Sequence, residues 1–272
     1  MIKYIHCFGT SYTAGGGHEF DGRKDSLYLL NLETEYKKKY PNEIQTQFNF
    51  SYPGQLQKLV GNDIEVINHA KSGYGNELMY NEIWEIVSNP EFNPKEHIFI
   101  LEFSGIGRKL IWSNTINDYI ITNYTMDDDG YELIYNGTAV NYYYDSVETT
   151  NLLNKMEQEI IQPFYKESIS LKSVMKDIDR NTDFLISYLK HFSCNFFFSS
   201  PPYSACSPYD LDSHYFDFEG NQCFVTYYGG MGYTIEDDTN GLCKDGHMGM
   251  TGAKKVSKYI YNHLINNKFI SK

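Results

Sequence analysis

The sequence predicts an α/β fold, in which a mostly parallel β-sheet carries helices on both faces. Short apolar segments typical of strands alternate along the chain with segments of helical periodicity. Two of the apolar segments, 97–103 and 195–199, are nearly continuous, as is typical of strands that a parallel sheet buries on both sides. The chain has 272 residues, which is enough for one large domain with a substantial core.

The first half of the chain contains two strands and two helices of this pattern. Residues 2–8 form an apolar strand, and residues 52–60 form a short helix with Pro53 near its first turn. Residues 63–68 alternate between polar and apolar side chains, which predicts a second strand. Residues 76–88 form the next helix, because four side chains recur at helical spacing: Leu78, Ile83, Trp84 and Val87.

The second half continues the alternation. Residues 97–103 form the third strand, and residues 148–192 are helical, in two pieces divided near 167–170. Residues 195–199 form the fourth strand, which ends before two prolines. Residues 251–266 close the chain as a helix that has one apolar face: Val256, Ile260 and Leu264.

Three longer segments interrupt this pattern, at about 17–50, 115–145 and 203–243. The first contains a charged helix at 33–40, and the second is a β-hairpin with Gly130 in its turn. The tyrosines of the second and third segments could stack on sugar rings, pack against the core or form a protein interface. Because no linker or repeat divides the chain, residues 1–272 are expected to form a single domain.

Composition excludes several classes of function. A net charge of -12 argues against binding to nucleic acid, because the surface would repel phosphate groups. No apolar run approaches the length of a membrane span, and the N-terminus reads as a strand rather than a secretion signal. The five cysteines have no CxxC spacing and are expected to be reduced thiols, with Cys7 an inert core residue. These features predict a cytoplasmic protein without cofactor or metal, or a virion-associated one if a phage encodes it.

The chemistry-bearing residues follow strands of the predicted sheet. Ser11 follows the first strand, Gly73 the second and the segment 104–108 the third, while His247 precedes the last helix. Ligands of open parallel sheets bind at the carboxyl ends of the strands, so these residues are expected to converge on one edge. A serine hydroxyl becomes a nucleophile when a nearby histidine removes its proton. In this scheme Asp245 orients His247 and stabilises its charged form.

The segments that carry these residues resemble the sequence blocks of the SGNH (GDSL-like) hydrolases. Gly9-Thr10-Ser11-Tyr12-Thr13 resembles the first block, with Thr10 where Asp is usual, and Asn68-His69-Ala70-Lys71-Ser72-Gly73 resembles the second. Asp245-Gly246-His247, followed by a helix, resembles the last block, and 52–56 resembles a short helix that lies between the first two. The resemblance covers the core of the chain but not its three insertions.

The resemblance implies a flavodoxin-like, three-layer α/β/α sandwich and the hydrolysis of small acyl esters, such as O-acetyl groups on carbohydrate. It implies Ser11 as the nucleophile, His247 as the base and Asp245 as its partner. The backbone amides of Ser11 and Gly73 would bind the oxyanion that forms during acyl transfer. The expected partner is therefore a small ester or acylated glycan, and neither nucleic acid nor a membrane.

Two departures from the family pattern are visible. The third block has Ile106 near the position of the usual Asn, which leaves Ser104 and Arg108 as candidates to bind the oxyanion or substrate. The last block has one residue between its Asp and His instead of two, and Met248 follows the His where Pro is usual. Both forms are similar to those of phage-encoded members of the family.

Each candidate residue also has a structural alternative. Ser11 and His247 could cap helices, Asp245 and Gly73 could be ordinary turn residues, and Arg108 could form a surface ion pair. The alternative for the whole chain is a non-catalytic structural or binding protein on a degenerate hydrolase scaffold, such as a component of a phage particle. Assembly into a homo-oligomer or a virion would accompany that alternative.

Overall fold

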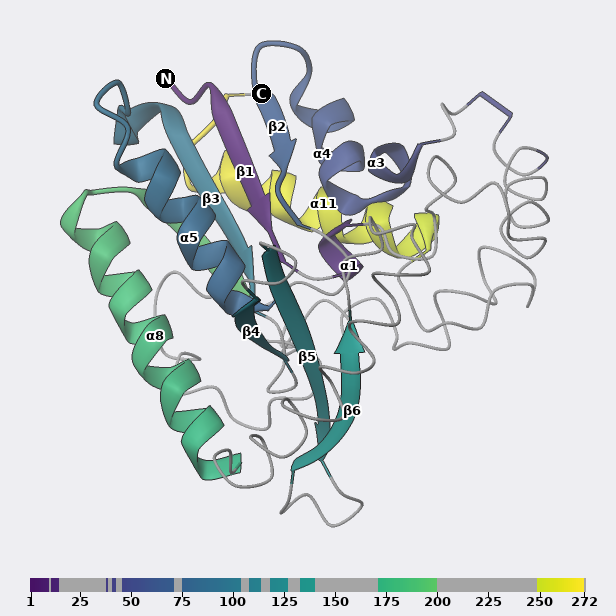
Figure 1. The fold of residues 1–272 in the computed structure, drawn as a ribbon. Helices are drawn as coiled ribbons and strands as arrows, with labels where there is room; N and C mark the ends of the chain where they lie inside the picture. The colour runs from purple at the N-terminus through teal and green to yellow at the C-terminus, as the bar shows by residue number, and fades with distance from the viewer. Residues whose placement is uncertain are drawn as a thin grey trace.

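The fold is taken from a computed structural model, which describes the following residues: 1–9, 11–14, Lys38, 41–42, 46–70, 75–103, 108–113, 118–126, 133–139, 171–199 and 249–271. They form a mixed α/β structure built on a four-stranded, all-parallel sheet (Figure 1). The strand order is β2-β1-β3-β7, with these bounds: β1 Tyr4–Phe8, β2 Glu65–Asn68, β3 His97–Glu102 and β7 Asn195–Ser199. The prediction of an α/β fold with a parallel sheet is confirmed for this part of the chain.

One face of the sheet is covered by helices α4 (Tyr52–Val60) and α11 (Met250–Asn266). These helices bury a continuous apolar cluster against alternate residues of the strands. Its fully enclosed members are Ile5, Cys7, Tyr52, Leu56, Ile98, Ile100, Val256, Ile260 and Leu264. The predicted apolar face of the last helix is therefore its packing face.

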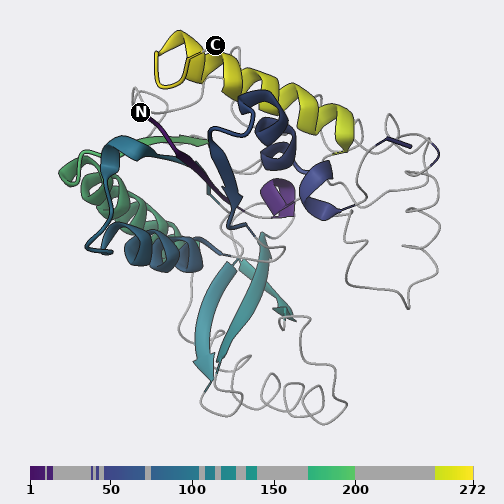
Figure 2. The same cartoon turned by 90° about the horizontal axis from the view of Figure 1, so that it is seen from above.

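The opposite face of the sheet is covered by α5 (Asn76–Val87) and α8 (Leu171–His191), as Figure 2 shows from above. The strand residues that point to this face alternate with those of the first cluster, as the pleat of a strand requires. Among the buried residues of this second cluster are Phe8, Met79, Ile83, Phe99, Leu101, Leu185, Leu189, Phe196 and Phe198. Helices thus lie on both faces of the sheet.

Most element boundaries agree with those predicted from the sequence. The helix predicted at 52–60 and the strand predicted at 195–199 have those bounds, and the others differ by one or two residues. Helix α4 begins where the Ser51 hydroxyl accepts a hydrogen bond from the amide of Gly54, at 3.3 Å. It ends at Gly61, whose φ of 78° is one that glycine adopts without strain.

Two of the four apolar residues predicted for α5, Leu78 and Trp84, do not belong to its buried face, and Leu78 is only partly buried. Trp84 is 53% exposed, whereas Ile83 and Val87 of the same helix are buried. The Trp84 ring stacks on Tyr188 of α8, with ring centroids 5.0 Å apart. The buried face of α5 is therefore formed by Asn76, Met79, Ile83 and Val87, while Trp84 remains exposed beside Tyr188.

A second sheet of three antiparallel strands lies beyond the carboxyl ends of the parallel strands (Figure 1). It consists of β4 (Arg108–Ser113), β5 (Asp118–Met126) and β6 (Leu133–Ala139). The β5–β6 pair is the predicted hairpin, and its turn lies outside the described residues. Strand β4 was not predicted.

The remaining described elements are short. They are α1 (Ser11–Ala14), α3 (Gln47–Phe50) and the 3-10 turn η1 (Pro94–Glu96). Helix α3 occupies the end of the first predicted insertion, and the charged helix predicted at 33–40 lies outside the described residues apart from Lys38. The first piece of the predicted long helix, 148–170, lies outside them too, and α8 is the second piece.

The described helices were also searched for membrane-spanning character. None of them combines the length and the apolar composition that crossing a bilayer requires.

The packing of α11 predicts a large loss of stability when its buried face is truncated. Ile260 is fully buried, so Ile260→Ala should lower the free energy of unfolding by about 2–5 kcal/mol, through lost burial and a cavity. Leu59→Ala on α4 is the matched control, since Leu59 is 41% exposed, and should change it by less than about 1 kcal/mol. Urea denaturation measures both values, and equal losses would contradict the assignment of the core.

Candidate functional site

The described site lies where the parallel strands end at one edge of the sheet. In the strand register Cys7 pairs with Asn68, Phe8 with Leu101, and Glu102 with Ser199. The carboxyl ends of all four strands therefore meet at the same edge. Helix α1, whose first residue is Ser11, begins three positions after β1 ends.

Thr13 connects α1 to two strands of the sheet. Its hydroxyl donates a short hydrogen bond to the Glu102 carboxylate at the end of β3, and both side chains are buried. Its backbone carbonyl accepts a hydrogen bond from the Asn68 amide at the end of β2, at 3.2 Å. A buried carboxylate is costly unless it receives hydrogen bonds, so the contact with Glu102 favours one position of α1.

Gly9 allows the close approach of α1 to β3. A Cβ atom at this position would overlap the Thr13 hydroxyl and the Glu102 carboxylate. Any larger residue would therefore force these two side chains apart. A glycine is required at position 9 because Glu102 leaves no room for a side chain there. The backbone angles of Gly9 do not themselves demand a glycine.

Tyr52 brings a phenol from α4 to the same network. Its pKa is raised well above the usual value by burial and by the neighbouring Cys7 thiol and Glu102 carboxylate, so it stays neutral. Burial also raises the pKa of Cys7, to about 12. The thiol is thus an inert core group, as the sequence predicted.

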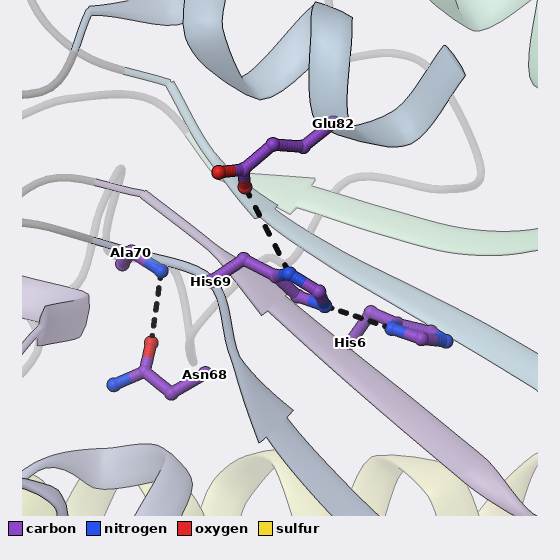
Figure 3. Close-up of polar contacts among 5 residues, drawn as sticks. All are labelled: His6, Asn68, His69, Ala70 and Glu82. Carbon is purple, nitrogen blue, oxygen red and sulfur yellow. Dashed lines mark hydrogen bonds and ion pairs between the residues drawn. The ribbon is translucent and has the colours of Figure 1, made fainter. Parts of the chain in front are cut away.

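The segment that follows β2 is fixed at its start by two hydrogen bonds. The backbone amide of His69 donates to the carbonyl of Cys7 at 2.9 Å, which continues the pairing of β2 with β1. The amide of Ala70 donates to the Asn68 side chain at 3.1 Å (Figure 3). These two bonds fix the chain as far as Ala70, where the described part of this segment ends.

Three histidines form a hydrogen-bonded chain on the α5 side of the sheet. His6 of β1 bonds through Nδ1 to Nε2 of His69 and through Nε2 to Nδ1 of His97, both at 2.9 Å. The Glu82 carboxylate of α5 lies 3.8 Å from Nδ1 of His69, on the side away from His6 (Figure 3). That distance allows electrostatic attraction but is too long for a hydrogen bond.

The carboxylate at one end favours a single arrangement of protons along the chain. A neutral imidazole has one donor nitrogen and one acceptor nitrogen. Glu82 favours a proton on Nδ1 of His69, so Nε2 of His69 accepts from His6. His6 then accepts at Nε2 from Nδ1 of His97, and every bond donates toward Glu82.

The interior member of this chain is held neutral. His6 is only 4% exposed, and burial, followed by the nearby His69 and His97, lowers its pKa from 6.5 to about 3. Burial also lowers the pKa of His97. Phe8 stacks on His69 with centroids 4.4 Å apart, and Phe99 stacks on His6 at 5.1 Å, which holds the rings in place.

Two of the six predicted site residues fall within the described residues. Ser11 is the first residue of α1, described for its backbone only, and Arg108 is the first residue of β4, where it pairs with Asn123 of β5. The other four lie outside the described residues: Gly73, Ser104, Asp245 and His247. The approach of Ser11 to His247 and Asp245 stays a prediction.

Neither the Thr13–Glu102 contact nor the histidine chain was predicted from the sequence. Glu102 is a carboxylate inside a nearly continuous apolar strand, and His6 is an imidazole at an inward position of β1. A polar residue at a core position is the signal that could have identified both, because such residues need partners. No local pattern identifies the partners themselves.

Comparison of the chain with protein-family models, with curated proteins and with solved structures finds no match. Among the described residues, no three His, Cys, Asp or Glu side chains are grouped so that they could hold a metal ion. The ring nitrogens of the three histidines instead form hydrogen bonds with one another.

Removing the Thr13 hydroxyl should destabilise the protein. Thr13→Val preserves the shape of the side chain but leaves the buried Glu102 carboxylate without this donor, which should cost about 1–3 kcal/mol in the free energy of unfolding. Thr13→Ser keeps the hydroxyl and is the matched control. Urea denaturation at pH 7 measures both variants, and a valine variant as stable as the serine variant would contradict the role of this hydrogen bond.

The buried histidine predicts a loss of stability in acid. His6 binds a proton below about pH 6.5 in the unfolded chain but only near pH 3 in the folded one, so acid favours unfolding within this window. Between pH 7 and pH 5 its contribution should fall by about 2 kcal/mol. His6→Phe removes this contribution, so the stability difference between wild type and variant should change with pH. Parallel pH curves, from urea denaturation, would refute the prediction.

Proposed function

We propose that this protein is a serine esterase of the SGNH type, which hydrolyses a small acyl ester such as an O-acetyl group on a glycan. The proposed finer architecture is a flavodoxin-like, three-layer α/β/α sandwich. It is supported by the parallel order β2-β1-β3-β7 and by the helices on both faces of the sheet. The sequence blocks of the family supply the residues of the proposed site.

The proposed reaction proceeds through an acyl-enzyme. The Ser11 hydroxyl attacks the ester carbonyl while His247 takes its proton, and Asp245 orients the imidazole. The amides of Ser11 and Gly73 stabilise the oxyanion of the tetrahedral intermediate. Collapse of this intermediate breaks the ester bond, and the proton on His247 passes to the departing alcohol. Water, deprotonated by His247, then releases the carboxylic acid and regenerates Ser11.

The observation that carries the proposal is the anchoring of α1. Ser11 lies at the carboxyl edge of the parallel sheet, on a helix that the Thr13–Glu102 bond ties to β3 and the Asn68 side chain ties to β2. A nucleophile must be held within a fraction of an ångström to react efficiently. One buried and one partly buried polar contact on a four-residue helix favour such rigidity.

The third block supports a modified substrate site rather than the family's usual one. Arg108 begins β4 and pairs with Asn123 of β5, so its backbone has a fixed place in a strand. A guanidinium at this position could bind a carboxylate, phosphate or oxyanion of the substrate. Ser104 remains the other candidate donor.

The second candidate function is a structural or binding protein on the same scaffold, for example in a phage particle. The three-stranded antiparallel sheet favours it, since that sheet extends beyond the parallel core (Figure 1). The absence of the third-block Asn favours it too, because loss of one oxyanion donor costs about 10²–10³ in rate. A virion-borne esterase would combine both roles.

Labelling with a fluorophosphonate probe tests the proposal directly. The probe phosphonylates activated serines, so wild-type protein should gain the mass of one adduct, and Ser11→Ala should gain none. Ser88→Ala, an exposed serine that follows α5, is the matched control and should label like wild type. Intact-mass spectrometry measures the adducts. A folded wild-type protein that stays unlabelled would contradict the esterase and favour the binding protein.

A further inference from the structure

Ser11 lies between two residues that contact the same buried carboxylate. Gly9 comes two positions before Ser11, and a Cβ atom at Gly9 would overlap the Glu102 side chain. Thr13 comes two positions after Ser11, and its hydroxyl donates a hydrogen bond to Oε2 of Glu102. The chain on both sides of the proposed nucleophile is therefore packed against one side chain of β3.

We propose that Glu102 is a positioning residue for Ser11, because its carboxylate holds helix α1 in one place against the end of β3. This inference rests on the proposed esterase function. Glu102 acts through its contacts with Gly9 and Thr13. It is only 2% exposed, so it touches no substrate itself.

The parallel sheet makes Glu102 a fixed point of reference. Glu102 is the last residue of β3, and its backbone position is paired with Ser199 of β7. On the other side of β3, Leu101 is paired with Phe8, so the register brings Gly9 next to Glu102. Groups that are held by the strands of a scaffold are placed more precisely than groups on loops. A helix that is attached to Glu102 thus takes its position from the sheet.

Helix α1 depends on such an attachment because it is short. Its four residues, Ser11–Ala14, make about one turn, and isolated helices of this length are marginal in water. Two hydrogen bonds of Thr13 connect it to the sheet: the hydroxyl donates to Glu102, and the carbonyl accepts from the Asn68 side chain. A hydrogen bond to a carboxylate is about twice as strong as one between neutral groups, so the contact with Glu102 is the stronger of the two.

Substitutions of Glu102 test this role. Glu102→Met keeps an unbranched side chain but removes the acceptor of the Thr13 hydroxyl. It should lower kcat for a chromogenic acetyl ester about 10²-fold while KM changes little, because the nucleophile is displaced and the substrate still binds. Glu102→Gln retains an oxygen that can accept from Thr13, so it should recover much of the lost rate.

A core truncation far from α1 is the matched control for stability. Leu189 of α8 is fully buried in the cluster on the α5 side of the sheet. Leu189→Ala should lower the urea midpoint more than Glu102→Met does, because it leaves a cavity, whereas Glu102→Met removes a carboxylate that is costly to bury. Leu189→Ala should nevertheless keep the wild-type kcat. If kcat falls in both variants in proportion to lost stability, Glu102 is a structural residue and the inference is wrong.

The rate of labelling by the fluorophosphonate probe reports on Ser11 without the ester. This rate should fall in Glu102→Met together with kcat. If Glu102→Met does not fold, Thr13→Val removes the same hydrogen bond from the side of α1 and should show both losses, which Thr13→Ser should largely restore. A folded Glu102→Met or Thr13→Val protein with wild-type kcat and a wild-type labelling rate would overturn the inference.

The same experiments distinguish this inference from the proposed function. A wild-type protein that neither labels with fluorophosphonate nor hydrolyses the ester overturns the esterase, and the positioning role of Glu102 with it. A wild-type protein that reacts, together with a Glu102→Met variant that reacts equally well, overturns only the role of Glu102.

Discussion

The pairing of β1 with two neighbours at once is the constraint on which the described structure depends. This five-residue strand lies between β2 and β3 and is parallel to both. Because it is central, its odd and even residues must satisfy different layers: Ile5 and Cys7 pack toward α4 and α11, whereas His6 and Phe8 point toward α5. One short segment therefore determines the register of the sheet and the contents of both interfaces.

Each interface next to β1 also contains a polar network within its apolar core. On the α4 side Tyr52, Thr13 and Glu102 lie beside Cys7, and on the α5 side His6 connects His69 and His97. Buried polar groups of this kind stabilise a fold less than apolar residues of the same volume would, unless every member is satisfied. What they contribute is a defined orientation of the side chains, because a hydrogen bond fixes the orientation of its partners and a hydrophobic contact does not.

The sequence predicted the elements whose signal is local and failed where the signal is not. The strand at 195–199 and the helix at 52–60 were predicted with their observed bounds, because an apolar run and a proline-started helix are visible in a few residues. Strand β4 was missed, since its apolar residues, Leu110, Ile111 and Trp112, are consecutive and do not alternate with polar ones, and its pairing with β5 cannot be read from a local pattern. The exposed position of Trp84 could not be read from helical spacing, because its contact lies on α8.

The same distinction applies to the candidate site. The predicted site residues Ser11 and Gly73 came from a resemblance to a family, whereas the contacts described around α1 and the end of β2 join residues far apart in the chain. Thr13 and Glu102 are 89 positions apart, and His6 and His97 are 91 apart. Single-sequence patterns contain no information on which buried polar residue meets which other. Only the sheet register brings them together.

The two networks meet at one place, the end of β2. Asn68 and His69 are consecutive, so their side chains point to opposite faces of the sheet. Asn68 reaches the carbonyl of Thr13 on α1, while His69 reaches His6 on β1 and faces Glu82 on α5. Because hydrogen bonds hold two adjacent residues on opposite faces of the sheet, the backbone has little freedom at the end of this strand. Helix α1, which begins with Ser11, and the chain as far as Ala70 are therefore held by contacts of the same two consecutive residues.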